Sequence, residues 1–192
     1  KKNLNERKIN LDDDYIKFLR YGQYYIEKNG EGILAYISNN SFIDGITHRQ
    51  MRKNLLETFD KIYILNLHGN SRIKEVCPDG SSDENVFDIM QGVSINIFIK
   101  TRNKKPSELG KVFHSDIYGK RELKYPFLLE NSISTIKWRK LENKEPYYFF
   151  VPKDFELQDS YKKGFKVRDI FTFNNTGIQT GKDSLVIDSN KE

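Results

Sequence analysis

A group of polar side chains with one aromatic directly follows an apolar run of the sequence. The run covers residues 32–38 and has the length and composition of a short buried strand. In an α/β sheet, the carboxyl end of such a strand lies where these sheets bind their ligands. Amides and a hydroxyl there can line a substrate cleft, and an aromatic ring can stack on a ligand or pack inside. We therefore assign Asn39, Asn40, Ser41 and Phe42 as candidate substrate-binding residues. The same residue types also suit a strand-to-helix loop whose side chains only cap backbone groups.

A second candidate group follows the apolar run at residues 61–67. His68 precedes Gly69, which lets the backbone turn and aim the histidine into a cleft. Arg72 and Lys74 follow within six residues and can contact phosphate oxygens. We assign these three cationic or titratable side chains as candidate DNA contacts. A histidine with local hydrogen bonds and solvated loop charges are the alternatives.

Other kinds of chemistry find little support in the sequence. Cys77 is the only cysteine, so no internal disulfide can form, and the three histidines lack metal-ligand spacing. The segment at residues 177–183 has three residues between its glycines and then Lys-Asp, whereas a phosphate-binding loop needs four and then Lys-Ser or Lys-Thr. We therefore expect no metal site and no nucleoside triphosphate site.

The composition indicates a soluble globular protein with an anionic partner. Its 192 residues suffice for one domain or for one domain and part of a second, and aromatic residues make up 13%. The net charge of +5 favours nucleic acid through long-range attraction, although such a surface also serves solubility alone. The sequence has no apolar run of about 20 residues and no signal-peptide pattern, so we expect no membrane association and a cytoplasmic location.

The hydrophobic pattern alternates helices with short strands. We predict a helix over 11–29, with Tyr15, Phe18, Leu19, Gly22 and Ile26 on one face, and a helix over 47–58 capped by Thr47. Strands are predicted at 32–38, at 61–67 and around 111–118, the first of them covered on both faces in a parallel sheet. The alternating segment 93–99 predicts an antiparallel edge or inserted strand. A further helix or irregular segment is expected around 120–134. The loop at 68–91 between strands is long enough to be a site.

This order of elements and motifs resembles a known enzyme family. Ser-Asn-Asn-Ser-Phe at 38–42, Asn-Leu-His-Gly at 66–69, Asp-Glu-Asn-Val-Phe-Asp-Ile at 83–89 and Gly-Val-Ser-Ile-Asn-Ile-Phe at 92–98 occur in the order found in adenine-specific DNA methylases. The likeness is closest to the methylase region of the large single-chain (type II) restriction-modification enzymes. It covers residues 12–101, and a weaker likeness at 177–183 is similar to the start of a target-recognition region.

The resemblance implies a reaction and further site residues. Such enzymes transfer a methyl group from S-adenosylmethionine to the exocyclic amine of an adenine flipped out of duplex DNA. Phe87 lies where the family has an aromatic that stacks on that adenine, although a phenylalanine between Val86 and Ile89 is more often a core residue. In the loop at 177–183, the candidates for DNA contact are Gln179, Thr180 and Lys182, with an ordinary polar turn as the alternative.

The family's donor-binding turn and its Asn-Pro-Pro-Tyr-type loop are both absent from this sequence. We therefore expect them upstream of Lys1, no catalytic residue in this chain, and neither methylation nor tight binding of S-adenosylmethionine by the chain alone. The predicted fold is α/β: the second half of a Rossmann-like methyltransferase sheet, mixed with one antiparallel strand, at 1–135, and a linker with the beginning of a target-recognition region at 136–192.

Two alternatives to the enzyme fragment stay open. One is a non-catalytic nucleic-acid-binding module, and the other is an interaction domain whose charge serves only solvation. The expected partner of the enzyme is double-stranded DNA, and that of the binding module is nucleic acid. Self-association through a sheet edge is also expected to be possible, because an unpaired edge is a template for another strand. The recognised DNA sequence, and whether a nuclease accompanies the methylase, cannot be read from these residues.

Overall fold

The computed structural model describes residues 9–105, 107–171 and 173. The chain divides into two units, Lys1–Lys153 and Asp154–Glu192. The second unit contains, among its described residues, the short helices α5 (Gln158–Lys162) and α6 (Val167–Ile170). The first unit is a mixed α/β structure, and the candidate site lies within it. No described helix is long and apolar enough to cross a membrane.

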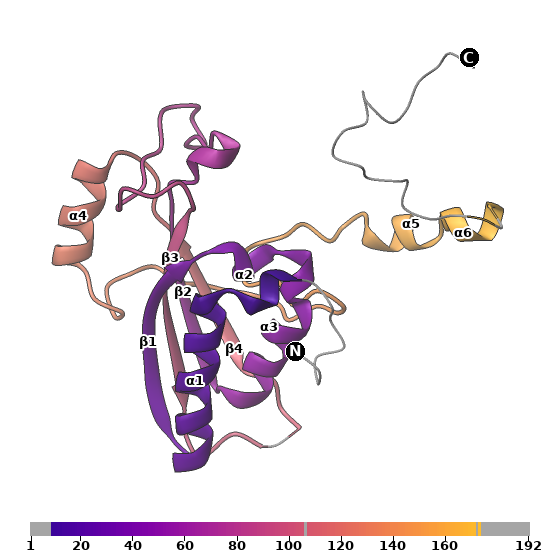
Figure 1. Cartoon of the computed structure of the whole chain (residues 1–192), viewed down its shortest axis with the longest axis horizontal. Helices are drawn as coiled ribbons and strands as arrows, with labels where there is room; N and C mark the ends of the chain where they lie inside the picture. The colour runs from indigo at the N-terminus through magenta and orange to yellow at the C-terminus, as the bar shows by residue number, and fades with distance from the viewer. Residues whose placement is uncertain (1–8, 106, 172, 174–192) are drawn as a thin grey trace, which may run out of the picture. The chain divides into compact units, whose positions relative to one another are not determined.

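A five-stranded mixed sheet forms the centre of the first unit (Figure 1). Its strands are β1 (Gly32–Asn39), β2 (Lys61–His68), β3 (Val93–Lys100), β4 (Lys111–Asp116) and β5 (Arg139–Lys140). They lie in the order β1-β3-β2-β4-β5. β2 and β4 are parallel, and β3 runs antiparallel to both of its neighbours, β1 and β2. β5 is antiparallel to β4, so the sheet has one more antiparallel strand than the sequence predicted.

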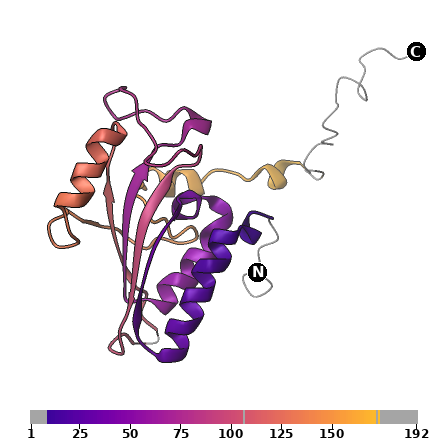
Figure 2. The ribbon, with the colours of Figure 1, turned by 60° about the vertical axis from the view of Figure 1, so that its left-hand side comes forward.

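Helices cover both faces of this sheet (Figure 2). The helices α1 (Asp14–Asn29) and α3 (Arg49–Thr58) pack on one face, where Leu19 and Leu55 join Ile64 in the larger hydrophobic core. The short elements η2 (Ile9–Asp12), α2 (Ser41–Asp44) and η3 (Ile46–His48) precede or link them. On the other face, Phe127 and Leu128 of α4 (Arg121–Glu130) pack against a smaller cluster around Leu65.

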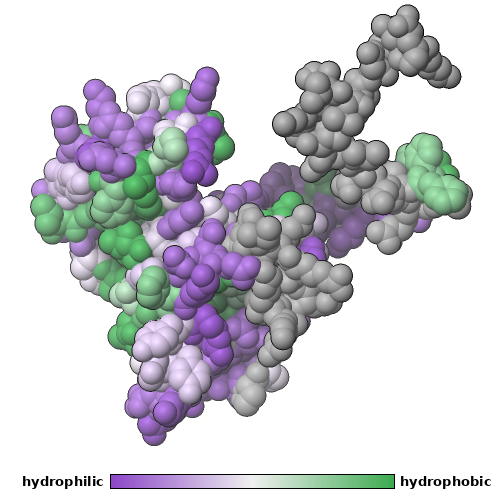
Figure 3. Space-filling view, in the orientation of Figure 1, coloured by the Kyte–Doolittle hydropathy of each residue, from purple (hydrophilic) through white to green (hydrophobic). Residues whose placement is uncertain are grey.

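β1 is the main departure from the predicted fold. The apolar run forms a strand at the predicted place, but it pairs only with β3 and lies at the edge of the described sheet. Ile33 and Ile37 are 68% and 48% exposed, so the expectation that this strand is covered on both faces was wrong. An apolar run shows that a segment has apolar side chains, but it does not show which strands or helices will lie beside that segment. Figure 3 shows hydrophobic surface along the side where β1 and α4 lie.

β3 is the inserted antiparallel strand that the alternation predicted, and it is not an edge. Its polar side chains point to the buried face: Ser94 and Asn96 are fully buried, while Ile95 and Ile97 are only partly covered. Asn96 Nδ2 donates to Tyr36 O at 3.1 Å and to Ser38 Oγ at 3.2 Å, and Ser94 Oγ donates to Asn96 Oδ1 at 2.9 Å. Hydrogen bonds between strands thus satisfy a polar row beneath the helices.

Two details of the predicted helices also differ from the structure. Phe18, expected on the packed face of the first helix, is 63% exposed, whereas Ile16, Leu19 and Gln23 are buried. α3 begins at Arg49 after the 3-10 turn η3, and its start has no side-chain capping hydrogen bond, so Thr47 does not cap it. The expected boundary between residues 135 and 136 remains a prediction; by its contacts, the segment up to Lys153 belongs to the first unit.

Candidate functional site

The carboxyl ends of three strands lie together at one end of the sheet. β1, β2 and β4 run in the same direction, because β1 and β2 are both antiparallel to β3 and β4 is parallel to β2. The loop from Gly69 to Gly92, which contains η4 (Ser71–Ile73), connects β2 to β3 at this end. Ligands of α/β sheets bind at such an end.

The residues after β1 divide between local structure and the site. Asn39 Oδ1 accepts hydrogen bonds from Ser41 N at 2.8 Å and from Ser41 Oγ at 2.6 Å, which is the capping role named as the alternative. Asn40 Nδ2 donates to Asn66 Oδ1 at 2.9 Å and lines a pocket. Phe42 is fully buried and packs edge-on against Phe150, so of stacking and packing the structure shows packing.

His68 lies between two carboxylates. Its Nδ1 is 2.7 Å from Glu75 Oε1, and its Nε2 is 2.8 Å from Asp116 Oδ1. The ring is 6% exposed and stacks on Tyr118, with ring centroids 3.8 Å apart. In this conformation both ring nitrogens are engaged, so His68 has none directed to DNA and acts in the local network that was the alternative interpretation.

The charges around His68 favour its protonated form. Burial disfavours the imidazolium, but hydrogen bonds with Asp116 and Glu75 outweigh burial and raise the pKa of His68. Burial alone would raise the pKa of Asp116, yet hydrogen bonds from His114 and His68 hold it well below its usual range. The pKa of Glu75 is lowered in the same way, chiefly by His68. Burial and the nearby Asp116 raise the pKa of Tyr118 to about 12.

A polar pocket of about 400 Å³ opens beside this network. His114, at the end of β4, joins it through Nε2, 2.9 Å from Asp116 Oδ1, while its Nδ1 is 2.8 Å from Phe150 O. Sequence reasoning missed His114 and Asp116, although His-Ser-Asp at a strand's carboxyl end was a usable signal. The pocket's polar lining residues are Asn40, Asp44, Asn66, His68, Asn70, Glu75, His114, Asp116, Tyr118 and Lys153.

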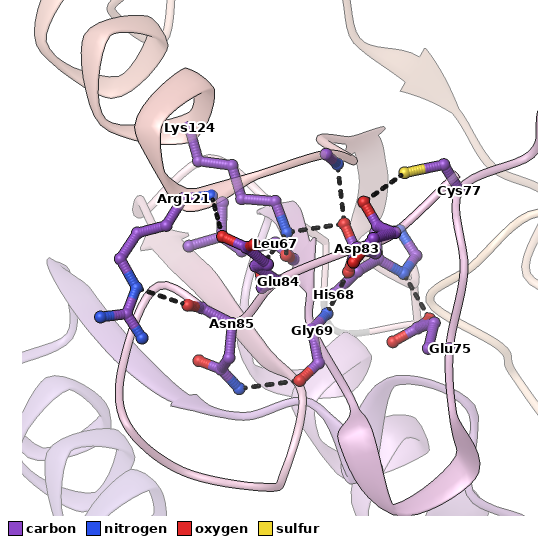
Figure 4. A network of polar contacts seen from close by, with 12 residues as sticks. Leu67, His68, Gly69, Glu75, Cys77, Asp83, Glu84, Asn85, Arg121 and Lys124 are labelled. Carbon is purple, nitrogen blue, oxygen red and sulfur yellow. Dashed lines mark hydrogen bonds and ion pairs between the residues drawn. The ribbon is translucent and has the colours of Figure 1, made fainter. Parts of the chain in front are cut away.

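A buried ion pair anchors the long loop to the sheet and to α4 (Figure 4). The side chains of Lys124 and Asp83 are both 0% exposed and lie 2.8 Å apart. Lys124 Nζ also donates to Leu67 O at 2.7 Å and to Glu84 O at 2.6 Å. Asp83 accepts from Gly69 N at 2.6 Å and from the backbone of Gly119 at 2.7 Å. The ammonium group of Lys124 and both carboxylate oxygens of Asp83 thus have hydrogen-bond partners, which a buried ion pair needs in order to offset its desolvation.

Asn85 closes the neck of the loop that contains Phe87. Asn85 Nδ2 donates to Gly69 O at 3.1 Å and to Gln91 O at 2.6 Å, and its Oδ1 accepts from Phe87 N at 2.9 Å. Phe87 itself is 44% exposed, although Val86 beside it is buried in the smaller core. The core interpretation of Phe87 therefore does not hold, and its ring faces a shallow pocket of about 420 Å³.

The remaining candidates are exposed or lie outside the described residues. Arg72 and Lys74 are exposed in the turn after β2. Gln179, Thr180 and Lys182 lie outside the described residues. Within the part of the chain that the structure describes, no group of three or more histidine, cysteine or carboxylate side chains has a geometry that could hold a metal ion.

Comparison with known proteins finds similarity at the level of solved structures. No protein-family model matches the sequence, and no curated protein matches it. The chain is similar to the ATP-dependent type ISP restriction-modification enzyme LlaBIII bound to DNA, with 31% identity and a TM-score of 0.65 over 80% of this chain and 10% of that one. It is also similar to a nuclease-deletion mutant of the type ISP restriction-modification enzyme LlaGI in complex with a DNA substrate mimic (25% identity, TM-score 0.64, 78% of this chain and 14% of that one).

A DrdV–DNA complex is a third similar structure, with 25% identity and a TM-score of 0.62 over 73% of this chain and 14% of that one. The described fold is therefore that of a domain found in DNA-bound restriction-modification enzymes. The chain spans only 10 to 14% of the length of these similar structures.

Proposed function

We propose that this chain is part of a site-specific DNA methyltransferase of a restriction-modification system, which transfers a methyl group from S-adenosylmethionine to the N6 amine of a flipped adenine. The observation that carries the proposal is the similarity to LlaBIII over 80% of the chain. The motif residues at 38–42, 66–69 and 83–89 lie at one end of the sheet, where β3, which carries the motif at 92–98, begins. Double-stranded DNA is the proposed partner, and the similar structures are complexes with DNA.

In this proposal, the residues of this chain hold the extruded base and line the pocket beside it. Phe87 presents an aromatic ring on an anchored loop, where it can stack on the extruded base. Asn40 and the His68 network line the neighbouring polar pocket. S-adenosylmethionine would supply the methyl group, but no residue of this chain matches the family's donor-binding turn. We therefore propose that the donor site and the Asn-Pro-Pro-Tyr-type loop belong to a part of the enzyme outside this chain.

The open edge of β1 suggests where that part joins. β1 is paired along all eight residues with β3 and has no partner on its other side among the described residues. A strand at this edge would extend the sheet and cover backbone groups that are otherwise unpaired. The proposal therefore places the donor-binding half of the sheet beside β1.

The test is a methyl-transfer assay on the 192-residue chain and on the full natural polypeptide that contains it. Radiolabelled S-adenosylmethionine and mixed genomic DNA serve as substrates, because the recognised sequence is not known. We expect transfer by the full polypeptide and none by the chain, with no calorimetric binding of S-adenosylmethionine to the chain. Absence of transfer by the full polypeptide would leave a non-catalytic nucleic-acid-binding module as the function.

Phe87 gives the assay a residue-level control. Base stacking on an aromatic is worth roughly 1–3 kcal/mol, so Phe87→Ala should lower transfer by the full polypeptide about 5- to 150-fold. Phe87→Tyr keeps the ring and should retain most of the activity. If both variants were equally active, Phe87 would not stack on the base.

A further inference from the structure

The loop that presents Phe87 has two more exposed apolar side chains at its tip. Ile89 is 46% exposed and Met90 is 55% exposed, and both line the same shallow pocket as Phe87. We call Phe87, Ile89 and Met90 the apolar tip. Exposed apolar side chains are unfavourable in water, and a partner that covers them gains free energy.

The apolar tip is held on an anchored backbone. Asn85 closes its neck, and Tyr125 Oη of α4 donates to Val86 O at 2.6 Å. Arg121 Nε donates to Asn85 O at 2.9 Å, and its Nη2 donates to Asp88 Oδ1 at 2.7 Å. The buried Lys124–Asp83 pair fixes the residues just before the neck. The tip therefore presents its side chains with little further loss of conformational entropy on binding.

The size and chemistry of this surface fit nucleobases. A stable protein interface needs about 800 Å² on each partner, and three side chains cannot supply it. A nucleobase has apolar faces and polar edges, and the pocket combines the apolar tip with the polar groups of Asn85 and Arg121. The ionisable side chains that line this pocket are Asp83, Glu84, Asp88 and Arg121, so carboxylates outnumber cations there. They disfavour phosphate and leave the bases as the part of DNA to be contacted.

The three residues of the apolar tip lie close enough together to reach neighbouring bases. A chain extends at most about 3.6 Å per residue, so Ile89 lies within about 7 Å of Phe87 and Met90 within about 11 Å. Successive bases along a strand are about 3.4 Å apart. Ile89 and Met90 can therefore reach the base steps that flank a base stacked on Phe87.

We propose that Ile89 and Met90 form an apolar wedge that inserts at the base step next to the extruded base, where it replaces lost stacking. Apolar side chains of this kind unstack and kink duplexes in other DNA-binding proteins. The inference rests on the proposed function, because it assumes that DNA is the partner and that a base leaves the stack.

The test compares the 192-residue chain with its Ile89→Ala/Met90→Ala double variant. Binding is measured by fluorescence anisotropy at low and moderate salt, on a labelled matched duplex of about 24 base pairs and on the same duplex with one mismatched adenine. 2-Aminopurine next to the mismatch reports unstacking of that step. Leu129→Ala, at an 87% exposed apolar position on α4, is the matched control.

We expect the chain to prefer the mismatched duplex and to brighten 2-aminopurine. The double variant should lose at least about 5-fold of that preference and most of the brightening, with matched-duplex affinity within two-fold and the control unchanged. If Phe87→Ala reduces the preference but the double variant does not, the wedge is wrong and the proposed function stands. If no salt-sensitive binding occurs on either duplex, the proposed DNA partner and the wedge both fail.

Discussion

Arg52 links segments that lie far apart in the chain. It is fully buried, and its guanidinium donates to the carbonyl oxygens of Phe42 and Gly45 and to those of Tyr147 and Tyr148. Burial lowers the pKa of Arg52 to about 10, and no described acidic side chain forms an ion pair with it. The backbone carbonyls therefore solvate the charge and tie the wall of the polar pocket to α3.

Replacing Arg52 should destabilise the protein severely. Arg52→Met keeps much of the volume but removes the side-chain donor to four backbone carbonyls, of which only Gly45 O keeps a backbone donor among the described residues, His48 N, so we expect a loss of roughly 3 kcal/mol or more in the free energy of unfolding. Urea denaturation measures this loss. Arg102→Met, at an exposed cation paired with Glu31, is the control and should change stability by less than about 1 kcal/mol. Equal effects of the two variants would show that the carbonyl cluster does not need the guanidinium.

His68 should make stability depend on pH in a defined direction. Its folded pKa is raised, so its contribution is complete below the unfolded value of about 6.5 and is lost as pH rises through the folded pKa. The stability difference between the protein and His68→Gln should therefore shrink between pH 6 and pH 9. This range avoids the low pH at which Asp116 and Glu75, with depressed pKa values, would lose their own contribution.

His48 is the matched control for that experiment. Burial lowers its pKa, so the neutral form is the stable one and its penalty appears as pH falls. His48→Gln should thus change the pH dependence in the opposite sense. Urea unfolding of the three proteins at several pH values would contradict the assignment if both variants shifted the profile in the same direction.

At the scale of elements, the junction between β2 and the long loop depends on Gly69. Its φ is +80°, and a Cβ there would lie 2.4 Å from Asn85 Cα. Glycine is therefore needed at this position for two reasons: the positive φ and the lack of space for a Cβ. This close approach lets Asn85 reach Gly69 O and close the neck of the loop.

Gly69→Ala should therefore be costly. Strain from a positive φ is of the order of 1 kcal/mol, and the contact with backbone atoms adds to it, so we expect roughly 3 kcal/mol in total. Gly80→Ala isolates the first effect, because Gly80 has φ +83° and no atom within 4 Å of the added Cβ. Thermal or urea unfolding of the two variants measures the difference. Similar losses for both would mean that the loop moves away from β2 without cost.

At the scale of the whole molecule, the unpaired edge of β1 is a surface through which the chain can self-associate. The strand has no charged residue and no proline, the devices that usually protect an exposed edge. Ile33, Ala35 and Ile37 are exposed on one face of it. The chain on its own should therefore pair edges with a second copy.

Sedimentation equilibrium of the 192-residue chain should show a concentration-dependent dimer. Ile37→Lys places a charge at the edge and should weaken the dimer at least about 10-fold, whereas Leu129→Lys on α4 should leave it unchanged. A monomer at all concentrations, or a dimer sensitive only to Leu129→Lys, would contradict edge pairing.

The amino-acid sequence by itself determined the type and order of the main elements. The apolar runs at 32–38 and 61–67 became β1 and β2, the alternating segment at 93–99 became β3, and the long loop after β2 contributes to the candidate site. Local periodicity is sufficient for this, because side-chain patterns of period 2 and 3.6 distinguish strands from helices, although the pattern did not give the buried face of β3. The motif order around Phe87 was also visible without a structure.

Only the tertiary structure decided which elements are neighbours and which polar groups meet. β3 inserts between β1 and β2, which makes β1 an edge and buries Asn96, although its sequence pattern favours isoleucines as the core side. Lys124 meets Asp83 across 41 residues, and Asp116 meets His68 across 48. Local patterns cannot predict such pairs, because they depend on strand order and on loops that bring distant backbone together, and those are set by long-range packing of the whole chain.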